Sequence, residues 1–496
     1  MGTVNCAEMR AIERAAMDSG WTEERMLDHA GTQLGHALGR HFPHPGTAVG
    51  YLGKGHNAGD TLVALRVLRD AYGWQVAARC AFGIESCAPL TRQKWVELGL
   101  ASPLDGPPAH PRVPLVLLDG LLGIGATGAL RRPLAELAAE MERLRQKSGA
   151  IVAAVDLPSG LDPDRGEMAE GGVTADITFL IGNAKAGALH STAVNETGVL
   201  ALVPVEPLAI AADGPIELIA PQEMDFGKAV RPFDFHKGLA GKVAVVAGSA
   251  AYPGAAVLAA SGALRAGAGL VTLHVPESCA PIIAAKCPPE IIIRSYRSFR
   301  DLIIGDCGSC VVGCGLGETD AAGIAAFRNW LAGVRIPTVL DADALNWLAK
   351  SGCSDVFREN HLLTPHPGEF RRLAADLGDL PREDAARAFT VRHSATLLLK
   401  GARSLVSRRE HPLWVNSTGT PGMATGGQGD LLAGVIGALL AGGLASTEAA
   451  ALGAWICGRA SETASRSHGM SAESLTPSDT ALYLGAAFHD WRAAAR

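Results

Sequence analysis

The run with the clearest chemical potential is Gly426-Gly427-Gln428-Gly429-Asp430, which stands directly before an apolar stretch at residues 431–440. A glycine-rich turn at a helix start presents unpaired N–H groups to a developing negative charge. The aspartate at its end could take a proton from an attacking hydroxyl, as phosphoryl transfer requires. The alternative is an aspartate that only caps the helix. We favour a catalytic Asp430 in a phosphoryl-transfer site.

Three further polar segments follow strand-like runs in the same half of the chain. Residues 400–404, Lys-Gly-Ala-Arg-Ser, could hold a nucleotide phosphate or ribose. His366 lies between two prolines that fix its backbone, so it is either a held ligand or a satisfied structural histidine. Asp341 and Asp343 could position Mg²⁺, directly or through water, or could cap the next helix.

Polar residues also follow three strand-like runs of the N-terminal half. Residues 53–60, Gly-Lys-Gly-His-Asn-Ala-Gly-Asp, follow a strand and open a helix, which favours either anion binding or a plain tight turn. Asp119 and Asp156 each end another run, at the sheet edge where ligands bind in open α/β folds. Asn57, Asp119 and Ser159 could offer oxygens to a hard cation, and Asp156 could act as an acid or base. Helix or turn capping is the alternative for both aspartates.

The segments that must position these residues alternate between helix-like and strand-like patterns. Helical spacing appears at residues 7–18 and 61–71. Strand-like runs lie at 47–52, 74–81, 113–118, 150–155, 242–247, 270–275, 309–312, 338–340, 361–364 and 396–399. Such alternation predicts an α/β fold with parallel sheets covered on both faces. A proline-punctuated segment at 204–232, in which 216–219 could form a short strand, is the candidate linker. We therefore expect two domains, residues 1–225 and 226–496.

Composition agrees with an α/β enzyme and argues against several other classes. Hydrophobic residues make up 48% of the 496 residues and charged residues 19%, which is unlike a disordered chain. The net charge of −6 carries no clustered basic face, so we expect no nucleic-acid partner. The chain has no uninterrupted run of 18 apolar residues, so we expect no membrane span. The N-terminus lacks the apolar core of a secretory signal. We expect a cytoplasmic protein.

Cys307, Cys310 and Cys314 form a C-x2-C-x3-C cluster, the one cysteine group with metal-like spacing. A metal site would need a fourth ligand at a matching distance, and none is nearby. The valines between the second and third cysteines favour a buried strand and turn, with the cysteines as small hydrophobic residues.

The N-terminal motifs resemble the NAD(P)H-hydrate epimerase domain. The resemblance rests on the Gly59-Asp60 loop, Asp119 before its glycine-rich loop, the V-D-x-P-S-G turn at 155–160, and the stretches 174–179 and 185–187. It covers residues 5–205 and implies a Rossmann-like three-layer αβα sandwich, a K⁺ site at Asn57, Asp119 and Ser159, and a catalytic Asp156. The substrate-binding residues that it implies are His56, Asn57, Ala58, Gly59, Asp60, Gly123, Ile124, Gly125, Ala126, Thr127, Gly128, Ala129 and Asp156.

The loop departs from the family pattern at three positions. His56 stands where the family usually has Asn, and Ala58 and Thr61 stand where it usually has Gly. Residues 28–31, Asp-His-Ala-Gly, are an altered form of a usual E-N-A-G segment. These departures bear on the rate of epimerisation more than on the fold.

The C-terminal motifs resemble the ribokinase-like superfamily and, within it, the NAD(P)H-hydrate dehydratase branch. They are H-K-G at 236–238, Y-P-G-A at 252–255, G-C-G-L-G at 313–317, L-D-A-D-A-L-N, T-P-H-P-G-E-F, K-G-A-R-S and G-G-Q-G-D-L-L-A-G, in the family's order. The resemblance implies a ribokinase-like αβα domain. It implies substrate contacts at Ala255, Gly315, Gly317, His366 and Asp430, and adenine-nucleotide contacts at Lys400, Gly401, Ala402, Arg403, Ser404 and Gly429.

Together the resemblances imply repair of hydrated NAD(P)H. One domain would interconvert the R and S hydrates, and the other would dehydrate the S hydrate at the expense of ADP, giving AMP and phosphate. We expect K⁺ in the first domain, Mg²⁺ in the second, and NADHX, NADPHX and ADP as small-molecule substrates of a homo-oligomer that binds neither nucleic acid nor membrane. Two alternatives stay open: a ribokinase-like kinase that releases a stable phosphorylated product, and an N-terminal half that is a non-catalytic nucleotide-binding or scaffolding module.

Overall fold

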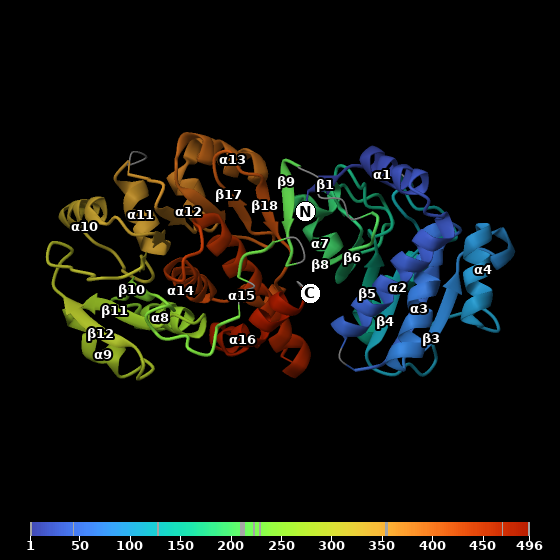
Figure 1. Cartoon of the computed structure of the whole chain (residues 1–496), viewed down its shortest axis with the longest axis horizontal. Helices are drawn as coiled ribbons and strands as arrows, with labels where there is room; N and C mark the ends of the chain where they lie inside the picture. The colour runs from blue at the N-terminus through green and yellow to red at the C-terminus, as the bar shows by residue number, and fades with distance from the viewer. Residues whose placement is uncertain are drawn as a thin grey trace. The chain divides into compact units, whose positions relative to one another are not determined.

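A computed structural model describes residues 2–42, 44–125, 128–208, 214–221, 224–227, 230–352, 356–468 and 470–494 (Figure 1). Contacts divide the chain into two compact units, Met1–Leu218 and Ile219–Arg496. The prolines of the linker predict a boundary after residue 225. The short strand predicted at 216–219 is present as β9 (Ile216–Ile219), at the edge of the C-terminal sheet.

The N-terminal unit is built on a six-stranded parallel sheet with the order β3-β2-β4-β5-β6-β8. The strands are β2 (Thr47–Leu52), β3 (Gln75–Cys80), β4 (Leu115–Gly120), β5 (Ile151–Val155), β6 (Ile177–Ile181) and β8 (Val199–Val203). β1 (Thr3–Val4) and β7 (Ala184–Lys185) form a separate parallel pair. The helices are α1 (Cys6–Asp18), α2 (Glu23–His41), α3 (His56–Tyr72), α4 (Pro89–Leu98), α5 (Leu134–Ser148), α6 (Ala186–Leu189) and α7 (Val194–Thr197).

Helices bury both faces of this sheet, and successive residues of each strand point to opposite faces. Ala48 and Leu52 of β2 pack in one core with residues of α2 and α3. Val49 and Tyr51 pack in a second core with residues of α5. The unit therefore has the predicted three-layer αβα arrangement, and burial on both sides explains why its strands are apolar throughout.

The C-terminal unit is built on a ten-stranded sheet with the order β12-β11-β10-β13-β14-β15-β16-β17-β18-β9. The strands from β12 to β16 are parallel, and β17 and β18 extend the sheet in antiparallel fashion. Their bounds are β10 (Lys242–Val246), β11 (Leu270–Pro276), β12 (Ile292–Tyr296), β13 (Ser309–Val312), β14 (Thr338–Leu340), β15 (His361–Leu363), β16 (Thr396–Leu399), β17 (Leu405–Ser407) and β18 (Leu413–Asn416).

Helices cover this sheet on both sides, with α10, α11 and α13 on one side and α8 and α16 on the other (Figure 1). The helices are α8 (Pro253–Arg265), α9 (Ala280–Ala284), α10 (Ala321–Gly333), α11 (Ala342–Lys350), α12 (Pro367–Leu373), α13 (Arg382–Arg392), α14 (Gln428–Ala441), α15 (Ser446–His468) and α16 (Pro477–Ala493). In the described residues, no helix has the length and apolarity needed to cross a membrane.

Helix α14, which carries Asp430, is buried as its apolar sequence predicts. It packs so closely on α8 that a Cβ atom added at Gly434 would lie 1.9 Å from the carbonyl oxygen of Ala259. A Cβ atom added at Gly262 of α8 would lie 2.3 Å from the carbonyl oxygen of Leu431. Small residues therefore bring the two helices into backbone contact and fix the position of the α14 N-terminus.

Candidate functional sites

The N-terminal site lies at the carboxyl ends of β2, β4 and β5, which are neighbours in the parallel sheet. Asn57 follows β2 in the first turn of α3, Asp119 is near the end of β4, and Asp156 comes directly after β5. Asp119 pairs in register with Tyr51 on one side and Ala154 on the other. Parallel pairing thus gathers the three predicted polar residues at one edge.

A pocket of about 650 Å³ opens at this edge. Of the predicted substrate-binding residues, those that line it are His56, Asn57, Asp60, Gly123, Ile124, Gly125 and Asp156. Ala58 and Gly59 are instead buried inside α3, while Gly128 and Ala129 are exposed outside the lining. The other two predicted residues, Ala126 and Thr127, lie outside the described residues.

The predicted cation ligands form one connected group. The Ser159 hydroxyl donates to Asp119 Oδ1 at 2.6 Å, and the Ser159 amide donates to Asp119 Oδ2 at 2.7 Å. The Leu122 amide donates to Ser159 Oγ at 2.9 Å, and Asn57 Nδ2 donates to the Leu122 carbonyl at 2.8 Å. Asp119 is fully buried with only neutral donors around it, and burial raises its pKa to about 6.

Asp156 is held in an unusual backbone conformation at the carboxyl end of β5. Its φ of 67° is in the left-handed region, which residues other than glycine rarely adopt. Its Oδ1 accepts hydrogen bonds from the Lys185 ammonium and, at 3.0 Å, from the Ile181 amide. Lys185 is buried and also donates to the Ile181 carbonyl at 2.8 Å. We did not predict a role for Lys185, because its partner lies 29 residues away in the chain.

The departures from the family loop are accommodated by packing. Thr61 is buried, and its hydroxyl donates to the Asn57 carbonyl at 2.8 Å. The His56 side chain is half exposed, with its Nδ1 3.6 Å from a Glu23 carboxylate oxygen. His56 therefore lies on the rim of the pocket, and the loop keeps Asn57 turned toward Leu122.

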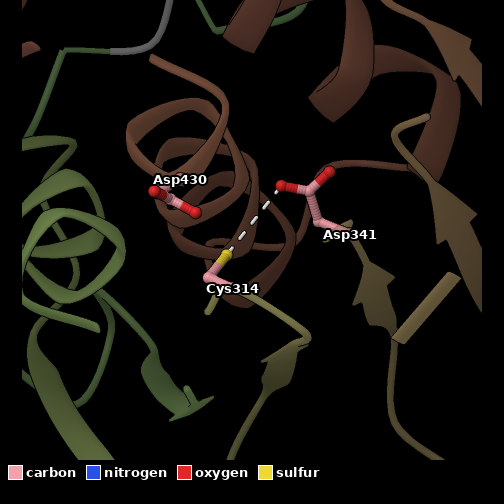
Figure 2. A group of neighbouring side chains, drawn as sticks. All are labelled: Cys314, Asp341 and Asp430. Atoms are coloured by element: carbon pink, nitrogen blue, oxygen red, sulfur yellow. Dashed lines mark hydrogen bonds between the residues drawn. The ribbon is translucent and has the colours of Figure 1, made fainter. Parts of the chain in front are cut away.

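The C-terminal site lies at the carboxyl ends of β13, β14, β15 and β16, which are consecutive in the parallel part of the sheet. Asp341 follows β14, Cys314 follows β13, and Asp430 is in the first turn of α14. Figure 2 shows the Cys314 sulfur close to both carboxylates. Its thiol donates a hydrogen bond to Asp341 Oδ2 at 3.9 Å. Burial raises the pKa of Asp430 to about 6, and the nearby negative charge of Asp341 adds to this effect.

Lys400 connects three of the predicted segments. Its ammonium donates to Asp341 Oδ1 at 2.7 Å and lies 4.0 Å from Glu369 Oε2. The same Asp341 oxygen accepts from the Thr364 hydroxyl at 2.9 Å. His366 caps α12: its Nδ1 accepts from the Gly368 amide, and its own amide donates to Glu369 Oε2 at 2.8 Å. The His366 ring is half exposed, so it remains available to a ligand.

The loop at residues 400–404 is shaped by Arg382, which sequence reasoning missed. Arg382 Nη2 donates to the carbonyls of Lys400 at 3.2 Å and Arg403 at 3.1 Å. Gly401 and Ala402 are exposed, whereas Arg403 is 3% exposed and turned into the protein. Burial lowers the pKa of Arg403 to about 10, an effect that Glu462 partly offsets. A ligand can therefore reach the backbone of residues 401–402 but not the Arg403 side chain.

Glycines create the close approaches within this site. A Cβ atom at Gly315 would lie 2.7 Å from the Ala255 Cβ atom, so these two predicted substrate residues are adjacent. A Cβ atom at Gly429 would lie 3.1 Å from Lys400 Nζ, which places the α14 N-terminus beside that ammonium. The Gly317 amide donates to Asp343 Oδ2 at 2.8 Å.

The cysteine cluster behaves as a packing feature. Cys310 and Cys314 are fully buried, and the Cys307 thiol donates to the Ile304 carbonyl. Within the described residues, the group with metal-like geometry is instead Cys314, Asp341 and Asp430, whose ligand atoms lie within 4.8 Å of one another.

Known proteins match both units of the chain. One family model, described as YjeF-related protein N-terminus, matches residues 23–187, and another, described as NAD(P)H-hydrate dehydratase, matches residues 243–481. The bifunctional NAD(P)H-hydrate repair enzyme of Gloeobacter violaceus is 35% identical, over 95% of this chain and 96% of its own. That of Methanopyrus kandleri is 32% identical, over 97% of this chain and 95% of its own.

Solved structures match the C-terminal unit. An ADP/ATP-dependent NAD(P)H-hydrate dehydratase from Bacillus subtilis, co-crystallized with ATP/Mg²⁺, is 26% identical. The match covers 53% of this chain and 94% of that chain, with a TM-score of 0.47.

Proposed function

The chain belongs to the family of bifunctional NAD(P)H-hydrate repair enzymes, and from this premise we propose what each of its two sites does. The N-terminal site interconverts the R and S forms of hydrated NAD(P)H. The C-terminal site dehydrates the S form with ADP as the phosphoryl donor, giving AMP and phosphate.

The position of Asp430 carries the proposal for the C-terminal site. Asp430 lies in the first turn of α14, beside backbone amides that a glycine-rich turn leaves open to a phosphoryl group. Its pKa of about 6 suits a base that takes the proton from the substrate hydroxyl near neutral pH. Hydroxide is a poor leaving group, and phosphorylation of that oxygen lets it depart as phosphate.

Lys400 is the best-placed cation for the donor nucleotide. Its ammonium is adjacent to Gly429 and is oriented by Asp341 and Glu369. The accessible backbone at residues 401–402 offers contacts to the nucleotide, whereas the buried Arg403 supports the loop from inside.

The carboxylates of Asp341 and Asp343 fit a Mg²⁺ ion that arrives with the nucleotide. Asp341 Oδ1 is occupied by Lys400 and Thr364, and Asp343 Oδ2 by the Gly317 amide. Because Mg²⁺ commonly keeps several waters and binds substrate phosphates, these carboxylates would hold it mainly through water. The bound ion would supply charge stabilisation for the transferring phosphoryl group.

In the N-terminal site, Asp156 is the proposed acid–base residue. Lys185 and the Ile181 amide bind one of its oxygens and thereby orient the carboxylate toward the pocket. Asn57, Asp119 and Ser159 fit a K⁺ ion, because they combine a buried carboxylate that lacks a charged partner with amide and hydroxyl oxygens. The ion would neutralise Asp119 and brace the loop that faces the substrate.

The decisive experiment supplies the purified protein with mixed R and S NADHX and either ADP or ATP. We expect NADH absorbance to recover with ADP, and AMP and phosphate to form in equal amounts. Asp430→Asn should lose dehydration by about a thousandfold or more while still interconverting the two hydrates on a chiral column.

Two results would contradict this assignment. A folded sample that restores no NADH with either nucleotide would exclude the dehydratase. A stable phosphorylated product, detected by mass spectrometry, would indicate a kinase instead.

A further inference from the structure

Helix α1 forms part of the N-terminal pocket, although it precedes the stretch that matches the family model. Met9, Arg10, Glu13 and Met17 of this helix line the pocket together with Asp156 and Lys185. The helix is fixed at its start by a capping box between Asn5 and Glu8. A residue on this helix therefore has a defined position relative to the strand ends.

Glu13 is the acidic residue that α1 turns toward the pocket. It is partly buried and lines the pocket, and in the described part of the chain its carboxyl group makes no hydrogen bond or ion pair. Burial raises its pKa, Lys185 opposes this effect, and the negative charge of Asp156 adds to it. Glu13 consequently keeps its proton to a higher pH than an exposed glutamate does.

Asp156 has the opposite surroundings. One of its oxygens accepts hydrogen bonds from the Lys185 ammonium and the Ile181 amide. Asp60 contributes a third carboxyl group to the same pocket. Burial raises the pKa of Asp60 strongly, and its buried Oδ1 has no hydrogen-bond partner among the described residues. In the part of the chain that the structure describes, Glu13 has no hydrogen-bond partner, whereas Asp156 accepts two hydrogen bonds, and two carboxyl groups in such different environments suit the roles of acid and base.

This inference rests on the proposed epimerase function. In hydrated NADH the hydroxyl-bearing carbon is bonded to the ring nitrogen, so its C–O bond can break with the help of the nitrogen lone pair. Inversion then needs one group that protonates the departing oxygen and another that deprotonates the returning water. No oxidant or reductant is required.

We propose that Glu13 is the proton donor of the N-terminal site and acts together with Asp156. Glu13 transfers its proton to the hydroxyl oxygen, the C–O bond breaks, water leaves, and the ring nitrogen forms a C=N bond. Water adds to the opposite face of that carbon, the nitrogen recovers its lone pair, and Asp156 accepts the released proton. The two carboxyl groups exchange roles in the reverse direction, and both return to their starting state through solvent.

The test compares Glu13→Gln with the wild type and with Asp18→Asn, which removes an exposed carboxylate from the same helix outside the pocket. Interconversion of purified R-NADHX is followed on a chiral column, and dehydration of S-NADHX with ADP is followed in the same samples. For Glu13→Gln we expect kcat for interconversion to fall about 100-fold or more with little change in KM. Asp18→Asn should keep the wild-type rate, and all three proteins should dehydrate S-NADHX equally.

A pH profile separates proton transfer from a purely structural role. The wild-type rate should decline at high pH as Glu13 loses its proton, and this decline should be absent from the residual rate of Glu13→Gln. Glu13→Asp should keep the decline at a reduced rate. The charged or titratable groups that face Glu13 are Arg10, His56, Asp60, Asp156 and Lys185.

The possible outcomes are distinct. A wild-type rate and pH profile in Glu13→Gln would overturn the role of Glu13 and leave the epimerase proposal standing. No interconversion by the wild type would overturn the epimerase proposal itself. If Glu13→Gln fails to fold, the profile of Glu13→Asp decides, and an unchanged rate in that variant would count against proton transfer.

Discussion

Asp430 and Cys314 show how single residues set the working pH of the C-terminal site. Asp430 must be ionised to act as a base, and its pKa is raised to about 6. We predict that kcat/KM for dehydration increases about tenfold per pH unit below 6 and levels off above 7. The Cys314 thiol hydrogen-bonds to Asp341, lies within 4.8 Å of Asp430 and lowers the pKa of Asp430, so Cys314→Ala should shift this rise in kcat/KM to higher pH.

Stopped-flow measurements of NADH absorbance between pH 5 and 8 would check this prediction. Cys310→Ala provides the matched control, because Cys310 is equally buried but lies in β13 rather than beside Asp430. An identical pH profile in Cys314→Ala and the wild type would rule out an effect of the thiol on the pKa of Asp430.

Asp119 leads to a second prediction, about stability. Its folded pKa of about 6 exceeds the unfolded value of 3.8, so ionisation destabilises the cation-free protein as pH rises through this interval. A K⁺ ion that binds the ionised form should reverse this loss. At 100 times its Kd it would add about 2.7 kcal/mol to the free energy of unfolding.

We therefore expect KCl to raise the Tm at pH 8 relative to tetramethylammonium chloride of equal ionic strength, and to have little effect at pH 5. Asp119→Asn should remove the difference between the two salts. Calorimetric scans of the full chain would measure both effects. A K⁺-dependent shift of equal size at pH 5 and pH 8 would contradict the carboxylate as the ligand.

At the scale of elements, a substitution at the N-terminus of α14 should lower activity without lowering stability. Gly429 is helical, so replacing it with alanine should leave stability unchanged or raise it by up to about 1 kcal/mol. The new Cβ atom would lie 3.1 Å from Lys400 Nζ and 3.7 Å from Asp341 Oδ2, within the space proposed for the phosphoryl group. We expect Gly429→Ala to lower kcat for dehydration about 100-fold.

Gly485→Ala is the control for this variant. Gly485 is an exposed helical glycine of α16, and a Cβ atom there meets open space. It should gain similar helix stability and keep full activity. Urea unfolding and steady-state rates would compare the two variants, and full activity in Gly429→Ala would exclude the proposed phosphoryl position.

Among the elements, the strands with long apolar runs could be predicted from the sequence. Strands with continuous apolar runs, such as β2 and β10, were identified, and with them the polar residues that follow each strand. Strands β17 and β18 lie inside the sheet between β16 and β9, and their antiparallel pairing depends on tertiary contacts that so short a local pattern does not encode. Lys185 and Arg382 were missed as site residues because their partners are set by tertiary packing, which local pattern does not encode.

At the scale of the whole molecule, one chain carries two chemistries that act on the same substrate. The two proposed catalytic residues, Asp156 and Asp430, belong to separate compact units, each with its own sheet. Interconversion supplies the S hydrate that dehydration consumes, and fusion of the domains supplies the two sites in equal numbers. Diffusion of the hydrate from one site to the other is sufficient for this coupling.

A mixing experiment tests whether the two activities are independent. Asp156→Ala should dehydrate S-NADHX but not R-NADHX, and Asp430→Asn should interconvert the hydrates but form no NADH. An equimolar mixture of the two variants should then recover NADH from pure R-NADHX, at a rate above that of either variant alone. If the hydrate diffuses freely between molecules, this rate should reach that of the wild type at the same concentration of active sites. A mixture that repairs R-NADHX at least tenfold more slowly, with both single activities intact, would show that repair requires both sites in one chain.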